Sequence, residues 1–264
     1  MNAPAPEGVP TTVNLGGGFV FVRRVDGHSA IVATGIAGTG AIGIMSASDV
    51  NARTDEALRQ WLQWWAFPDH ARLRRVNQVH GGRVVEASSY NGAAPDADGL
   101  WTRSPSDLLV IRAADCAPVW IVDPPHKTIA LVHAGWRGVA AGVVEHAIAA
   151  LASAGAYADD LHAAVGPHIG PCCFEVGPEV SQRFERDPGA VLPAVSLLIE
   201  RKREDGVALD LSAAITSRLL SAGVDLGRIE ASTACTRCRA DLFHSYRRNG
   251  TGGPLMAAIG AALP

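Results

Sequence analysis

Short runs of apolar, often β-branched residues recur along the chain, and most of them are bounded by Gly, Pro or charged turn residues. This pattern is typical of β-strands, because buried strands are short apolar runs that turns interrupt. It predicts strands over residues 19–24, 29–35, 73–79, 83–86, 108–112, 119–122, 128–132, 161–165 and 229–233.

Apolar residues spaced three and four apart predict four helices. The first follows Thr54, which can cap a helix, and ends at Pro68; its apolar positions are Leu58, Trp61, Leu62 and Trp65. The others cover residues 139–152, 178–186 and 211–221. Strands and helices that mix without strict alternation favour an α/β or α+β fold with mixed sheets.

The composition fits one large globular domain. Of 264 residues, 48% are hydrophobic and 19% are charged, which supplies a sizeable core and argues against a disordered chain. Residues 1–18 are rich in Pro and Gly and lack a basic region followed by an apolar one, so they are predicted to be a flexible lead-in and not an export signal. Residues 19–264 are predicted to form a single domain.

Charge and cysteine usage argue against several classes of protein. The net charge of -3 and the absence of a basic run argue against nucleic-acid binding. No apolar stretch approaches the roughly 20 residues that span a bilayer, which argues against a membrane protein. Five cysteines, an odd number at irregular spacing, argue against a disulfide framework and favour the reducing cytoplasm.

Three residues able to bind a metal stand at the ends of predicted strands. His80 follows the strand of residues 73–79, Cys116 comes after a strand that ends near residue 112, and His133 closes the strand of residues 128–132. Loops at the ends of neighbouring strands are held by the rigid sheet, so their side chains can converge on one site. Two imidazoles and one thiolate suit zinc and leave its fourth position open. The alternative interpretation is one packed cysteine and two structural histidines.

A second group of reactive residues lies in two loops nearer the C-terminus. The stretch VGPHIGPCCFEVGPEV holds His168, Cys172 and Cys173, and the stretch CTRCRADLFHSYRRNGTGG holds Cys235 and Cys238. A structural zinc site made of the four cysteines is one interpretation. Packed thiols are favoured instead, because adjacent cysteines do not easily point at one metal and a second CxxC is missing.

Six motifs occur in the order and spacing of the laccase-domain, or polyphenol-oxidase-like, family: NQVHG, DADGLWT, ADCAPVWIVDP, HAGWRGVAAGVV, GPHIGPCCFEVGPEV and FHSYRRNGTGG. The chain resembles this family over residues 73–253, and bacterial members are described as purine nucleoside phosphorylases. The resemblance implies a four-layer α/β/β/α sandwich with mixed sheets, related to a group once labelled cysteine hydrolases. It also implies that His80, Cys116 and His133 hold the metal, which is zinc, with copper as the alternative.

The function that the resemblance implies is that of a zinc-dependent purine nucleoside enzyme. Such an enzyme splits adenosine, inosine or methylthioadenosine with phosphate into the free base and ribose 1-phosphate, and it also deaminates adenosine. Its partners would be a nucleoside and phosphate, and the chain would be a monomer or a homodimer.

Residue types suggest roles for further side chains. A guanidinium group can donate two parallel hydrogen bonds to the oxygen atoms of a phosphate, so arginines are expected to bind the substrate phosphate. The expected substrate-binding residues are Asn77, Arg137, Arg247 and Arg248. The expected catalytic residues are Asp115, Cys116 and His168, with Asp115 or His168 as the group that transfers a proton.

Three other functions stay open. Cys116 as nucleophile with His133 as its base would make a metal-free cysteine hydrolase. Copper-dependent polyphenol oxidation is the second, although multicopper chemistry needs several centres and more histidines than this site offers. The third is a metal- or nucleotide-binding module without catalysis.

The chain departs from the family pattern at three places. Residues 35–56 replace the usual segment before the first helix, Gly253 stands where an arginine is common, and His244 stands where an aromatic residue is expected. The first two changes bear on substrate contacts and leave the metal ligands unchanged.

Overall fold

The structure is a computed structural model. It describes residues 71–186, 197–200, 206–250 and 255–260 and, before residue 71, the strand segments 11–12, 19–25, 28–33 and 42–46. The predicted helix around Trp61 and the position of Gly253 lie outside the described residues. Within the expected lead-in of residues 1–18, the described part is β1 (Thr11–Thr12), which pairs with β2 (Phe19–Val25).

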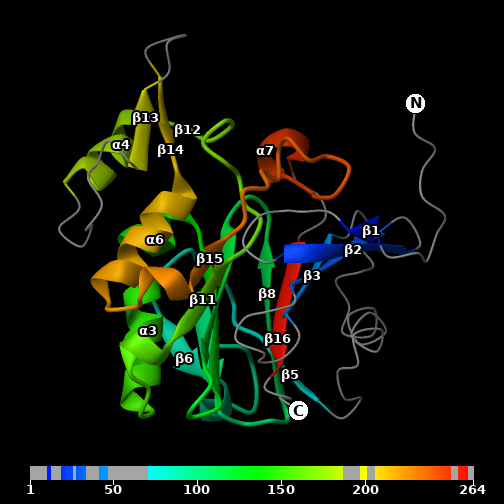
Figure 1. Cartoon of the computed structure of the whole chain (residues 1–264), viewed down its shortest axis with the longest axis vertical. Coiled ribbons are helices and arrows are strands. Elements are labelled where there is room, and N and C mark those ends of the chain that lie inside the picture. The colour runs from blue at the N-terminus through cyan, green and yellow to red at the C-terminus, as the bar shows by residue number, and fades with distance from the viewer. Residues whose placement is uncertain are drawn as a thin grey trace.

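A six-stranded sheet runs through the middle of the described structure (Figure 1). Its order is β15-β11-β9-β10-β7-β6, formed by β6 (Val84–Glu86), β7 (Gly99–Thr102), β9 (Ala117–Asp123), β10 (Thr128–Ala134), β11 (His162–Val165) and β15 (Ile229–Ala231). Every residue of β9 and β10 is buried, because both faces of the sheet are covered there. This explains why the two strands are nearly continuous apolar runs in the sequence. The β9–β10 pair is antiparallel, whereas β11–β15 and β6–β7 are parallel, which confirms the mixed sheet.

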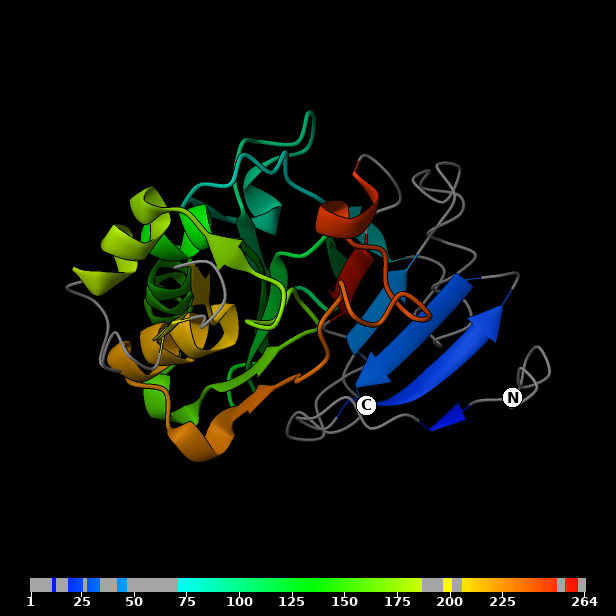
Figure 2. The same cartoon turned by 90° about the horizontal axis from the view of Figure 1, so that it is seen from above.

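A seven-stranded sheet packs against one face of the six-stranded sheet (Figure 2). Its order is β1-β2-β3-β4-β16-β8-β5, and its remaining strands are β3 (His28–Ala33), β4 (Ile42–Ser46), β5 (Arg72–Arg74), β8 (Asp107–Ala113) and β16 (Leu255–Gly260). Trp120 of β9 is fully buried between the sheets, where its indole N–H donates to the Ala258 carbonyl at 3.1 Å. This hydrogen bond links the two sheets at the centre of the core.

Helices cover the other face of the six-stranded sheet. The main ones are α3 (Val143–Ser153) and α6 (Leu211–Ser221), whose buried Val144, Leu151 and Leu219 share a core cluster with β9 and β10. The described layers are therefore helix, sheet and sheet, in agreement with an α/β fold of mixed sheets. The expected likeness to cysteine hydrolases stays a prediction.

Several predicted elements differ in extent. Helix α6 has the predicted bounds, but the helix expected over residues 139–152 is divided into α2 (Trp136–Ala140) and α3. Gly142 separates them with a φ of 79°, a left-handed conformation that ends one helix and precedes the next. The strand expected over residues 73–79 ends early, since β5 stops at Arg74 and the chain then turns toward the site described below.

A small third sheet lies beside the helices. It consists of β12 (Glu175–Val176), β14 (Val207–Leu209) and β13 (Leu198–Glu200), next to α4 (Pro178–Glu185). No described helix has both the length and the apolar character that crossing a bilayer requires.

Candidate metal-dependent active site

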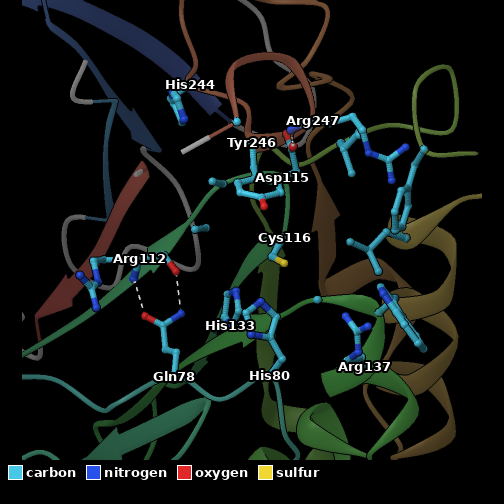
Figure 3. A pocket seen from close by; sticks show the side chains of 18 residues that line it. Gln78, His80, Arg112, Asp115, Cys116, His133, Arg137, His244, Tyr246 and Arg247 are labelled. Carbon is cyan, nitrogen blue, oxygen red and sulfur yellow. Dashed lines mark hydrogen bonds between the residues drawn. The ribbon is translucent and has the colours of Figure 1, made fainter. Parts of the chain in front are cut away.

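The three predicted ligands converge at one end of the six-stranded sheet (Figure 3). His80 lies in the loop after β5, Cys116 directly precedes β9, and His133 is near the end of β10. The register of β9 and β10 pairs His133 with Pro118, which brings the imidazole beside Cys116. One donor atom from each side chain lies within 4.8 Å of the other two. We call His80, Cys116 and His133 the metal triad.

A buried carboxylate orients two members of the triad. Asp98, fully buried before β7, accepts hydrogen bonds from the backbone N–H groups of Val79, His80 and Gly81 at 3.2, 2.9 and 2.6 Å. It also lies 2.9 Å from Nδ1 of His133, which leaves Nε2 of that ring as the ligand atom. Burial alone would raise the pKa of Asp98, but the hydrogen bonds from His133 and the backbone lower it. The ionised carboxylate thus fixes both the loop and the ring.

Local backbone conformation shapes the site. His80 and Asp115 have φ values of 59° and 78°, a left-handed region that non-glycine residues seldom occupy and that Asp98 stabilises around His80. At Gly135, any Cβ would lie 2.7 Å from Sγ of Cys116. Only glycine therefore lets the turn after β10 pass so close to the thiol.

The charges inside the triad favour a thiolate. Burial raises the pKa of Cys116, but hydrogen bonds from His133 and His80 outweigh it and lower the value to about 7. Burial likewise lowers the pKa of His133, but Asp98 and Cys116 outweigh it and raise the value to about 9. A thiolate is the form of cysteine that binds metals. The donor set, its spacing and the carboxylate behind His133 fit a zinc ion with an open fourth position.

The triad opens into a cavity of about 790 Å³. Aromatic rings and guanidinium groups line its walls: Trp136, Phe174, Tyr246, Arg112, Arg137 and Arg247. The Arg137 guanidinium lies 4.4 Å from the centre of the Trp136 ring, and that of Arg247 lies 5.6 Å from the centre of the Phe174 ring. The cavity therefore combines flat apolar surfaces with positive charge.

Asp115 lines the cavity, yet its carboxylate is engaged by the segment that leads into α7 (Tyr246–Asn249). It accepts from Oγ1 of Thr236 at 2.6 Å, Oγ of Ser245 at 3.0 Å and the backbone N–H of Arg247 at 2.7 Å. These contacts hold Arg247 at the cavity wall. The carboxylate expected to transfer protons is thus placed as an anchor.

Three other predicted residues do not line the cavity. His168 is buried behind it with Nδ1 2.8 Å from the Gly166 carbonyl, and burial lowers its pKa. Asn77 donates to Asp96 at 2.6 Å. The Arg248 guanidinium donates to three backbone carbonyls, those of Thr236, Arg237 and Phe243. The structure thus brings Arg137 and Arg247 to the cavity with the triad but not His168, Asn77 or Arg248.

Sequence reasoning did not single out several residues that line or support the cavity. They are Gln78, Asp98, Arg112, Trp136 and Phe174. Gln78 exchanges two hydrogen bonds with the backbone of Arg112, at 2.6 and 2.8 Å, and so closes one side (Figure 3). The DADG motif contains Asp98 and was the available signal. Because β7 was not predicted, nothing in the sequence indicated that the Asp98 carboxylate lies beside His133.

The four remaining cysteines also converge. The sulfur atoms of Cys172, Cys173, Cys235 and Cys238 all lie within 4.8 Å of one another. The expectation that adjacent cysteines would not point at one place was wrong. In a strand, successive side chains alternate in direction. Here the pair lies in a turn in which the N–H groups of Cys173 and Phe174 both donate to the Gly170 carbonyl.

The chain is similar to several known proteins. A family model described as multi-copper polyphenol oxidoreductase laccase matches residues 20–262. Purine nucleoside phosphorylase YlmD of Geobacillus stearothermophilus is 38% identical over 214 residues, which are 76% of this chain and 76% of that protein. Adenosine deaminase RL5, from an unknown prokaryotic organism, is 32% identical over 168 residues, 64% of this chain and 63% of that protein. The crystal structure of YlmD from Geobacillus stearothermophilus matches with a TM-score of 0.77 and 30% identity, over 92% of this chain and 98% of that one.

Proposed function

The chain belongs to the multi-copper polyphenol oxidoreductase laccase family, and from this premise we propose that it is a metal-dependent purine nucleoside enzyme. The observation that carries the proposal is the metal triad at a cavity with both aromatic and guanidinium walls. A nucleoside has a flat base, and phosphate is an anion, so the two kinds of wall match the two kinds of substrate. Similarity to proteins named purine nucleoside phosphorylase and adenosine deaminase supports the same assignment.

Zinc is the metal we assign to the triad. A zinc ion there would act as a Lewis acid and would make a water nucleophile available near neutral pH. Copper is the alternative metal, but oxidation by several copper centres requires many histidines. In the part of the chain that the structure describes, only one group of three or more clustered potential ligands includes histidine.

The first reaction we propose is phosphorolysis of adenosine, inosine or methylthioadenosine to the free base and ribose 1-phosphate. Arg137 in α2 and Arg247 in α7 approach the cavity from different elements and lie on different sides of Cys116 (Figure 3). Each guanidinium lies near an aromatic ring, a cation–π arrangement that restricts its position. We assign phosphate binding to this pair and base stacking to Phe174 and Tyr246.

Deamination of adenosine is the second reaction that we propose. It is favoured by the donor set of the triad, whose three protein ligands leave a position open for water. Asp115 serves both reactions as a positioning residue, because its three hydrogen bonds hold the segment that carries Arg247. We place the enzyme in the cytoplasm, since all five cysteines are free thiols. The expectation of a monomer or homodimer stays a prediction.

One experiment tests the assignment directly. Metal-defined protein is incubated with a panel of purine nucleosides, with and without phosphate, and the products are identified by mass. We expect ribose 1-phosphate only with phosphate, and inosine from adenosine in both conditions. Bound metal without turnover of any nucleoside would support a binding module instead. Turnover of a nonpurine ester or amide by metal-free protein, lost in Cys116→Ala, would support the cysteine hydrolase.

A further inference from the structure

Two loops that are distant in sequence lie side by side next to the active-site cavity. One follows β11 and contains Cys172 and Cys173, and the other precedes α7 and contains Cys235 and Cys238. His168 and Cys235 form a parallel bridge, and the N–H of Thr236 donates to the His168 carbonyl at 2.9 Å. The backbone thus holds the two pairs of cysteines against each other.

The four sulfur atoms have the spacing of a tetrahedral metal site. Sγ of Cys238 lies 3.6 Å from that of Cys172 and 3.4 Å from that of Cys173, and all four atoms lie within 4.8 Å of one another. Four thiolates at about 2.3 Å from one zinc ion stand about 3.8 Å apart. A disulfide would instead require about 2.05 Å.

The surroundings of Cys235 also suit a metal-bound thiolate. Cys235 and Cys238 form a CxxC turn, closed by the N–H of Arg239 on the Cys235 carbonyl at 3.0 Å. A C-x2-C spacing of this kind supplies two ligands in structural zinc sites. Gly170 of the other loop lies against Cys235, since a Cβ at Gly170 would be 3.3 Å from the Cys235 Cβ and 3.7 Å from its Sγ.

We propose that Cys172, Cys173, Cys235 and Cys238 bind a second zinc ion, separate from the metal triad, as a closed four-thiolate structural site. All four positions of the metal are filled by protein, so this ion offers no site to a substrate. Its role is to clip the two loops together. The inference concerns metal content and does not depend on which nucleoside reaction the enzyme performs.

The clip would act on the wall of the cavity. Phe174 directly follows Cys173, and the segment after Cys238 leads to Ser245 and Arg247. Arg247 packs over the Phe174 ring and also donates to the Glu175 carbonyl at 3.4 Å. Loss of the second zinc ion would therefore free both loops and lower the thermal stability of the protein.

Metal counting on the full-length reduced protein tests the proposal. Zinc-loaded protein is analysed by native mass spectrometry and elemental analysis. We expect two zinc ions per chain in the wild type and one in His80→Ala/His133→Ala. X-ray absorption of that variant should show zinc surrounded by four sulfur atoms at about 2.3 Å.

Cysteine variants complete the test. Cys172→Ser/Cys238→Ser should keep only the zinc ion of the triad, and the matched control Cys116→Ser should keep only the four-thiolate zinc. A single zinc ion in the wild type, or none in His80→Ala/His133→Ala, would overturn the proposal. So would a disulfide between the two loops in reduced protein, seen as the loss of two hydrogens in mass. If the double serine variant does not fold, the histidine variant decides alone.

Discussion

The metal triad and the cluster of Cys172, Cys173, Cys235 and Cys238 both contain thiol donors, but different backbone elements support them. The triad stands at the ends of buried strands, contains two imidazoles and faces the cavity, with Asp98 behind one ring. The cluster joins two loops, contains sulfur donors alone and would fill all four coordination positions of a zinc ion. An open site can take part in a reaction, whereas a closed one can only stabilise structure. The supporting backbone and the number of protein ligands, more than the type of donor atom, therefore distinguish a catalytic metal site from a structural one.

The largest effect that separates the two regions should come from Cys116→Ser. A neutral hydroxyl is a much poorer zinc ligand than a thiolate, so the triad should lose its metal and adenosine deamination should fall by about a thousandfold or more. Ammonia release and zinc content measure both losses. Cys172→Ser is the control, because it changes the other region; it should keep the zinc ion of the triad and lose far less deaminase activity than Cys116→Ser. Equal losses in the two variants would remove the distinction between an open and a closed site.

The second prediction compares the thiols of the two regions in reduced, metal-free protein. Hydrogen bonds from His133 and His80 outweigh burial and lower the pKa of Cys116 to about 7, so its thiolate forms as the pH rises through 7. Burial and neighbouring thiols raise the pKa of Cys172, so its thiolate forms only at much higher pH. Near pH 8, alkylation followed by peptide mapping should therefore modify Cys116 before Cys172.

The variant His133→Ala sharpens this prediction. Without the imidazole, the pKa of Cys116 should return toward the usual range, which lowers its thiolate fraction near neutral pH by up to about a hundredfold for a shift of two pKa units. Alkylation of Cys116 should slow accordingly, while that of Cys172 should stay the same. An unchanged midpoint for Cys116 would show that His133 does not set the protonation of the triad.

The third prediction concerns the carboxylate that only the triad possesses. Asp98→Asn keeps the shape of the side chain but removes the charge behind His133, and should weaken zinc binding at the triad by about 10- to 100-fold. Competition with a chelator measures this affinity. Asp96→Asn is the matched control, since Asp96 is exposed and its carboxylate bonds to Asn77. A comparable loss in both variants would show that the effect is general and not a property of the triad.

Sequence patterns predicted the two regions to different degrees. The buried strands β9 and β10 and helix α6 were predictable because apolar runs and helical spacing are local signals. His80, Cys116 and His133 were grouped because each follows a predicted strand and lies in a family motif, although the strand before His80 ends at Arg74. Asp98 was not singled out, because the strand that it precedes, β7, is short and was not predicted. The contact between the Asp98 carboxylate and His133 also joins residues that are 35 positions apart in the sequence. Convergence of the four cysteines depends on a bridge between His168 and Cys235, which no local pattern contains.

The roles of arginines show the same limit. Arg137, Arg247 and Arg248 are alike in sequence terms, but the structure separates them. The guanidinium of Arg248 donates to the carbonyls of Thr236 and Arg237, inside the CxxC turn, whereas that of Arg137 lies over Trp136 at the cavity wall. Only the fold shows which arginine braces a loop and which lines the cavity.

The smallest expected effect compares these two arginines. Lysine keeps the positive charge but loses the two-pronged hydrogen bonding of guanidinium, a loss worth about 1.4 kcal/mol, or about tenfold in rate. Arg137→Lys should therefore slow phosphorolysis about tenfold more than deamination, because only phosphorolysis needs phosphate held beside the nucleoside. Arg248→Lys should instead lower the melting temperature and leave the ratio of the two rates unchanged, since its three carbonyl contacts brace the loop. The rates are measured on adenosine with and without phosphate, and stability by thermal unfolding. If Arg137→Lys slowed both reactions equally and also lowered the melting temperature, Arg137 would be a brace for the turn after His133, and phosphate binding would have to be assigned to Arg247 and its neighbours.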